Sequence, residues 1–252
     1  MKKIFLALLC LFVSAIPAIA KDNVNLDLFN QADFKSFSED IGMATSYQPV
    51  APAAPLGDKL PGIDAGVEAS YVKFDTGSSW YTKMNAGLLL SGSGDTAPKE
   101  LYIPRVHIQV GIPVIPVDLG VSYSQVPNSD IKLIGYELKW AILSGGMAMP
   151  SIALRGAYTK LSDVDQLDLS TTSADISISK GILIFTPYAG VGSVWITSTP
   201  HDPVNPTLQK ENIRKTKGFV GTKIKFFPFL NMDLEADFAN VNVYTARLNV
   251  SF

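Results

Sequence analysis

The chain has 252 residues, of which 47% are hydrophobic, 10% aromatic and 17% charged. This composition is too apolar for a disordered protein, and the length suits one large domain. A formal net charge of −2 offers no basic surface for a nucleic-acid partner. The single cysteine, Cys10, excludes a fold held together by disulfides.

The first twenty residues have the pattern of a secretory signal peptide. Lys2 and Lys3 precede an apolar run over residues 4–13, and Ala18-Ile19-Ala20 fits a signal-peptidase site. We therefore expect residues 1–20 to be removed on export, together with Cys10. Residues 21–61 and 62–252 are then the two parts of the mature chain.

The last residues alternate between an apolar and a polar face, as a strand does. The apolar face ends in Phe252, and Tyr244 lies eight residues before it. This segment resembles the closing strand of bacterial outer-membrane β-barrels. The resemblance implies location in the cell outer membrane, contact with its lipid and lipopolysaccharide, and recognition by periplasmic chaperones and the barrel assembly machinery. The residues that it implies as the assembly signal are Tyr244, Leu248, Val250 and Phe252.

Similar alternating segments recur throughout residues 62–252. The connections between them alternate between short turns and longer polar loops, as in outer-membrane barrels with periplasmic turns and extracellular loops. We predict an all-β fold, a transmembrane antiparallel β-barrel of 10–12 strands. Its strands are expected near residues 62–75, 101–111, 115–126, 131–143, 151–161, 171–180, 183–197, 213–226, 230–238 and 244–252.

The number of strands depends on residues 76–99. Residues 80–90 alternate and would pair with a short strand over residues 44–50, which gives twelve strands. Alternatively, residues 76–99 form one extracellular loop, which leaves ten. Both numbers are even, as barrels of this kind require, so parity does not decide between them.

The polar faces of these strands carry charges of both signs. Facing Lys, Arg, Asp and Glu side chains indicate an ion network in a polar lumen, because neighbouring strands bring opposite charges together. We expect Arg247 to pair with Glu235 or Asp233. The residues of this network are Arg105, His107, Glu137, Lys139, Arg155, Lys223, Lys225, Asp233, Glu235, Asp237 and Arg247.

Residues 21–61 differ from the rest of the chain. Phe34, Phe37 and Ile41 have helical spacing, with Asn30 as a cap and Gly42 as a terminator, and prolines follow. We predict a short N-terminal periplasmic helix and a Pro-rich linker. The helix either packs at the barrel base or plugs the lumen.

The sequence contains no cofactor motif and no cluster of metal ligands, so we expect neither cofactor nor enzyme activity. His107 suits the hydrogen-bonded lumen better than a catalytic role. A basic cluster near the extracellular boundary is a candidate contact for lipopolysaccharide phosphates; it consists of Lys210, Arg214, Lys215 and Lys217. The leading function is a narrow transport or permeability protein for a small or hydrophobic solute. The alternatives are a non-transporting structural or surface-interaction barrel and, third, an outer-membrane enzyme.

Overall fold

The computed structural model describes residues 24–57, 60–92, 95–125, 131–146, 148–201 and 205–252. The predicted signal peptide, residues 1–20, lies outside them. The described residues form two helices and ten strands: α2 (Gln31–Thr45), β1 (Gly62–Lys73), α3 (Ser79–Leu90), β2 (Glu100–Gly111), β3 (Val117–Gln125), β4 (Lys132–Leu143), β5 (Ser151–Ser162), β6 (Leu167–Ser179), β7 (Phe185–Pro200), β8 (Glu211–Lys225), β9 (Leu230–Phe238) and β10 (Val243–Ser251).

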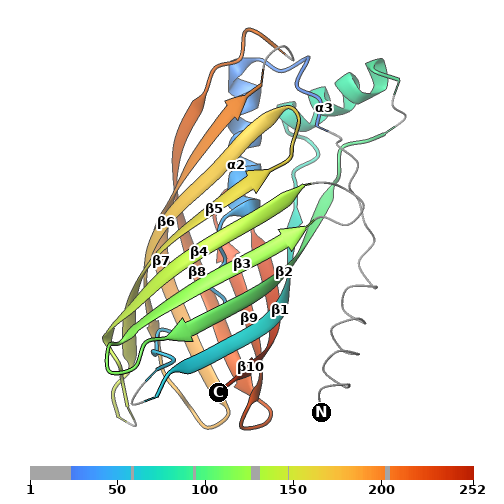
Figure 1. Cartoon of the computed structure of the whole chain (residues 1–252). Coiled ribbons are helices and arrows are strands. Elements are labelled where there is room, and N and C mark those ends of the chain that lie inside the picture. Colours follow the sequence, from blue (N-terminus) through green and yellow to red (C-terminus); the bar gives the residue numbers. More distant parts are fainter. Residues whose placement is uncertain (1–23, 58–59, 93–94, 126–130, 147, 202–204) are drawn as a thin grey trace.

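The ten strands form a closed antiparallel barrel (Figure 1). Each strand pairs with its neighbours in sequence, and β1 closes the barrel against β10 in a register running from Asp64 opposite Ser251 to Val72 opposite Val243. Closure gives each strand a hydrogen-bonded neighbour on both sides. The predicted all-β antiparallel barrel is confirmed, with ten strands.

The two ends of the barrel differ. Four short connections, residues 112–116, 144–150, 180–184 and 226–229, lie at the end where β1 begins and β10 ends, which we call the turn end. The opposite end, which we call the loop end, carries the two longest connections, residues 74–99 and 201–210, together with two connections of only four residues, 163–166 and 239–242. The two longest loops share one end, as in outer-membrane barrels, but the predicted alternation of lengths does not hold at every connection.

Burial alternates along every strand, but in the reverse sense to a water-soluble protein. Side chains with large apolar groups face outward and are exposed, whereas most charged side chains of the strands face inward and are buried. Exposed aromatic residues occur towards both ends of the outer surface, with Trp140 and Phe226 near the turn end and Tyr123 and Tyr244 near the loop end. Such a surface is stable only if an apolar medium surrounds it.

Residues 79–90 form the helix α3, so the twelve-strand alternative is wrong. The side chain of Ser78 caps the helix by accepting a hydrogen bond from the Tyr81 amide. Trp80, Met84 and Leu88 are buried on one helical face. The apolar residues of this segment also recur at a spacing of four residues. A helix therefore buries them better than a strand would. No helix in the described part of the chain is long and apolar enough to cross a membrane.

The N-terminal helix α2 has the predicted cap, but it continues past Gly42 to Thr45 and does not lie at the barrel base. Asn30 accepts a hydrogen bond from the Asp33 amide, and Asp33 bonds back to the Asn30 amide. The helix lies against β6, β7 and β8 at the loop end, opposite the end at which we placed it (Figure 1). Of the two placements that the sequence left open, the structure shows the plug. The reason is an apolar inner surface at the loop end, described below.

Candidate functional site: a lumen filled by the N-terminal segment

The chain runs from α2 down through the barrel before it enters β1. Residues 42–53 are all buried, although residues 46–53 belong to no helix or strand. We call residues 46–57 the lumen strap. A buried backbone without secondary structure needs hydrogen-bond partners from elsewhere.

Charged side chains of the barrel wall supply these partners. Lys139 Nζ donates to the carbonyl oxygens of Pro52 and Ala54, at 3.2 and 3.0 Å. The Val50 amide donates to Glu235 Oε2 at 2.9 Å, and the Leu56 amide donates to Asp118 Oδ1 at 3.1 Å. The strap is therefore held at several points along its length through its backbone.

Arg247 lies at the centre of this arrangement. Its Nε and Nη2 donate to Glu68 Oε2 at 2.8 and 2.6 Å, and its Nη1 donates to the Val50 carbonyl oxygen at 3.2 Å. Arg105 Nη1 lies 3.4 Å from the other oxygen of Glu68. The expected pairing of Arg247 with Glu235 or Asp233 is wrong. Asp233 is opposite Arg247 on β9, but Glu68 is opposite it on β1, and the guanidinium turns to Glu68.

Other inward residues complete the network. Lys217 Nζ donates to Asp237 Oδ1 at 2.9 Å and to the Tyr47 carbonyl oxygen at 3.3 Å. Tyr47 Oη is 2.9 Å from His107 Nε2. His107 therefore contacts the strap through Tyr47.

The structure places ten of the eleven predicted network residues in the buried lumen. Lys223 Nζ lies 3.0 Å from Asp64 Oδ2, and Arg155 Nε lies 3.2 Å from Glu137 Oε2. Lys225 differs from the prediction: it is exposed at the turn end, because β8 ends there. The network also contains three further buried acids, Asp64, Glu68 and Asp118.

The predicted lipopolysaccharide cluster divides between the two faces of β8. Arg214 faces outward, and its guanidinium carbon lies 5.3 Å from the Trp195 ring centroid. Lys210 is exposed just before the start of β8. Lys215 pairs instead with Glu39 of α2 at 2.6 Å, and Lys217 is buried in the lumen. Strand alternation separates residues that are neighbours in sequence, so the four cannot form one surface.

The loop end of the lumen is apolar. Inward side chains of several strands surround α2, including Ile103, Leu133, Ile196 and Ile213, and they pack with Phe34, Phe37 and Met43 of the helix. We call this ring the apolar collar. At Gly42 a Cβ atom would lie 2.5 Å from Ile196 Cγ2, so the missing side chain lets α2 approach β7. The prediction of a uniformly polar lumen is wrong here.

A clamp joins α2 to α3 above the collar. Asp33 accepts hydrogen bonds from Lys83 Nζ and, at 2.6 Å, from Ser79 Oγ. Burial of Asp33 acts to raise its pKa, but the bonds from Lys83, Ser79 and Asn30 outweigh that effect and lower the pKa below its usual value. Trp80 Nε1 donates to Asp40 Oδ2 at 2.9 Å. These contacts hold α2 and α3 together at the loop end.

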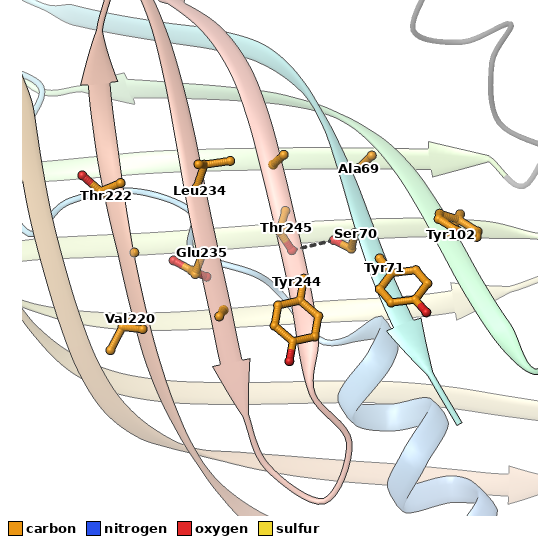
Figure 2. A pocket seen from close by; sticks show the side chains of 13 residues that line it. Ala69, Ser70, Tyr71, Tyr102, Val220, Thr222, Leu234, Glu235, Tyr244 and Thr245 are labelled. Atoms are coloured by element: carbon orange, nitrogen blue, oxygen red, sulfur yellow. Dashed lines mark hydrogen bonds between the residues drawn. The ribbon is translucent and has the colours of Figure 1, made fainter. Parts of the chain in front are cut away.

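Two hollows remain. A cavity of about 240 Å³ lies at the turn end, below the strap, and is lined by residues that include Asp64, Gln109, Lys223 and Lys225. A second hollow is an apolar groove on the outer surface, where Ala69 and Ala246 lie among Tyr71, Tyr102 and Tyr244 (Figure 2). In that view the hydrogen bond between Ser70 and Thr245 lies on the inner side of the wall. The groove holds no charged group on the outer face.

No group of three or more potential metal ligands occurs among the described residues.

His201 lies in the loop after β7, where its ring bonds to Asp168 and to the Asp165 carbonyl oxygen. These bonds raise the pKa of His201.

The predicted assembly residues lie on β10 and just after it. Tyr244, Leu248 and Val250 face outward, and Phe252 is exposed at the turn end, with backbone hydrogen bonds to Ile63. Their role in assembly stays a prediction.

No family model and no curated protein matches the chain. Among solved structures, it is similar to the Neisserial surface protein A, with 8% identity, coverage of 76% of this chain and 95% of that chain, and a TM-score of 0.34. It is similar to Ail, the attachment invasion locus protein of Yersinia pestis, with 13% identity, coverage of 76% and 97%, and a TM-score of 0.29. The translocator domain of the autotransporter NalP from Neisseria meningitidis gives 9% identity, coverage of 88% and 96%, and a TM-score of 0.36.

These likenesses are too distant to carry an argument, so the class rests on the geometry. A closed antiparallel barrel with an apolar outer surface and a charged interior defines an outer-membrane β-barrel protein. Its lumen is occupied by its own N-terminal segment.

Proposed function

We propose that this protein is a non-conducting outer-membrane barrel that serves as a structural or surface-interaction protein and has no catalytic role. The observation that carries the proposal is the unbroken burial of residues 42–53 inside the barrel. Narrow transport, which we favoured from the sequence, requires a free path through the same space.

The energetics favour a barrel that stays closed. An open path requires α2 to leave the apolar collar and would expose Leu26, Phe29, Phe34, Phe37 and Met43, all of which are buried. At about 1.5 to 3 kcal/mol for each side chain, withdrawal costs up to about 8 to 15 kcal/mol before any ion pair is broken. Spontaneous opening is therefore rare.

We propose that the barrel resides in the bacterial outer membrane with its loop end outside. The two longest connections, residues 74–99 and 201–210, lie at the loop end and support this orientation, because the long loops of outer-membrane barrels are extracellular. Lys210 and Arg214 remain candidate contacts for lipopolysaccharide phosphates. Fractionation of cells with the chain in the outer membrane supports the proposal, and recovery as a soluble periplasmic protein contradicts it.

Gated transport of a small solute is the second candidate. The turn-end cavity favours it, because Lys139 and Arg247 line this cavity and also hold the strap. A solute that competed for these donors would loosen the strap. This candidate requires the strap to move, whereas a structural barrel does not.

A cross-link distinguishes the two functions. The Ala53 amide lies 3.1 Å from Ser179 Oγ, so Ala53→Cys with Ser179→Cys, in a Cys10→Ser background, places two thiols side by side. Release of size-graded sugars from proteoliposomes is compared between the oxidised and the reduced protein. We expect no release from either form. Release only from the reduced form would establish gated transport instead.

A further inference from the structure

The four connections at the turn end are apolar at their tips. Val114 and Leu183 are 87% and 98% exposed, and Phe227 and Met149 are exposed in the other two connections. Lys180 is the only charged residue in the four connections by sequence. Exposed apolar groups of this size on every turn mark a contact surface. We call it the turn-end ring.

The backbone at two of these tips is strained. Val114 has φ of 69° and Leu183 has φ of 55°, in the left-handed region. Bulky side chains are disfavoured there by about 1 to 2 kcal/mol, and glycine or asparagine adopts this conformation more readily. Turn geometry alone therefore does not account for Val and Leu at positions where the side chain is almost fully exposed.

Several polar backbone groups of these turns are satisfied within the protein, without water. Pro113, Pro116, Pro150 and Pro228 have no amide hydrogen. In the turn after β6, the amides of Ile182 and Phe185 donate to one another's carbonyl oxygens, at 2.7 and 2.9 Å. The amide of Ile112 donates to the Val117 carbonyl oxygen at 2.9 Å.

The single charged side chain contributes to the same result. Lys180 Nζ donates to the carbonyl oxygens of Gly146 and Met149 in the neighbouring turn, at 2.8 and 3.1 Å. Its charge thus caps carbonyl groups that would otherwise need solvent. A turn with internal backbone bonds and apolar tips is suited to a region of low water content.

We propose that the turn-end ring is embedded in the membrane, at the boundary between phospholipid headgroups and acyl chains. The occupant is lipid because the ring is continuous with the lipid-facing wall, where Trp140 and Ile142 are exposed directly before one of the turns. Apolar tips occur on all four turns around the barrel, as surrounding lipid requires, whereas a protein partner would cover one side. The proposal does not depend on whether the lumen conducts.

Environment-sensitive labels test this proposal. Leu183→Cys and Val114→Cys are made in a Cys10→Ser background, labelled with a nitrobenzoxadiazole dye, and placed in phosphatidylcholine vesicles as full chains. Leu90→Cys is the matched control, because Leu90 is an equally apolar and 76% exposed residue at the loop end. We expect spin-labelled lipid to quench the two turn-end labels several-fold more than the control label, and aqueous iodide to show the reverse order.

Equal quenching of all three labels by iodide would overturn the proposal. Disulfide-linked dimers of Leu183→Cys in dilute vesicles, with little quenching by lipid, would assign the ring to a second copy instead. Leu183→Asn supplies a test that does not depend on labels, since asparagine tolerates the backbone. We expect its thermal midpoint in vesicles to fall relative to wild type, because a polar side chain then lies in the lipid; an unchanged or higher midpoint would contradict lipid contact.

Discussion

Arg247 and Glu68 face each other across the seam that closes the barrel, and the guanidinium donates twice to one carboxylate oxygen, at 2.8 and 2.6 Å. The same guanidinium bonds to the Val50 carbonyl oxygen of the strap. One side chain therefore connects the closure of the sheet with the filling of the lumen.

Arg247→Ala is expected to destabilise the barrel because it leaves Glu68 buried with only the weaker contact to Arg105. An orphaned buried charge costs about 3 to 5 kcal/mol, and water entering the lumen reduces this cost. Urea unfolding in lipid vesicles measures the free energy of unfolding. Lys225→Ala, at the exposed end of β8, is the control and should change it by less than about 0.5 kcal/mol.

The double substitution Arg247→Ala with Glu68→Gln should recover part of the lost stability, since it removes the orphaned charge and keeps a side-chain oxygen for Arg105. Equal losses for the single and double variants would show that the orphaned charge of Glu68 is not what destabilises Arg247→Ala.

The clamp between α2 and α3 should depend on pH through Asp33. Its pKa is lowered in the folded protein, so the carboxylate contributes stability above its unfolded pKa of about 3.9 and loses that contribution as the pH falls through the folded pKa. Asp33→Asn removes the contribution at every pH, at a cost of about 1 to 2 kcal/mol at neutral pH. Thermal midpoints of wild type and variant should therefore differ at pH 7 and converge below pH 4. A constant difference across this range would refute the role of the charge.

Gly42 should tolerate no larger side chain, because its Cβ position lies within 2.8 Å of three Ile196 atoms. Gly42→Val is expected to cost about 1 to 3 kcal/mol through overpacking in the apolar collar. Lys35→Val introduces the same residue on the exposed face of α2 and serves as the control. If thermal melting showed equal effects for both variants, poor helix propensity rather than contact with β7 would be responsible.

The alternation of apolar and polar residues in the sequence was sufficient to predict the strands of the barrel wall. It predicted the ten strands to within a few residues, because inward and outward positions differ in polarity along each of them. It failed for residues 79–90, where the same residues also present an apolar helical face around Trp80 and Leu88. A period of two and a period near four are difficult to separate over so few residues.

Local sequence patterns were less informative about the segment that fills the lumen. Many of the bonds that hold the strap go to its backbone, so apart from residues such as Tyr47 its sequence carries little trace of the barrel residues that hold it. The pairing of Arg247 with Glu68 joins residues 179 positions apart, and only closure of the barrel brings them together. One signal was available: Leu133, Leu161 and Ile213 are apolar at inward positions near the loop end, where a water-filled lumen would need polar groups.

The most direct test of the account is the ion conductance of the purified wild-type protein in planar lipid bilayers, with Arg247→Ala measured beside it. Because α2 and the strap fill the lumen, we predict no stable channel currents from the wild type, and at most brief, small openings from the variant, whose strap has lost one anchor. Large, long-lived currents from the wild type would contradict a lumen closed by its own N-terminal segment.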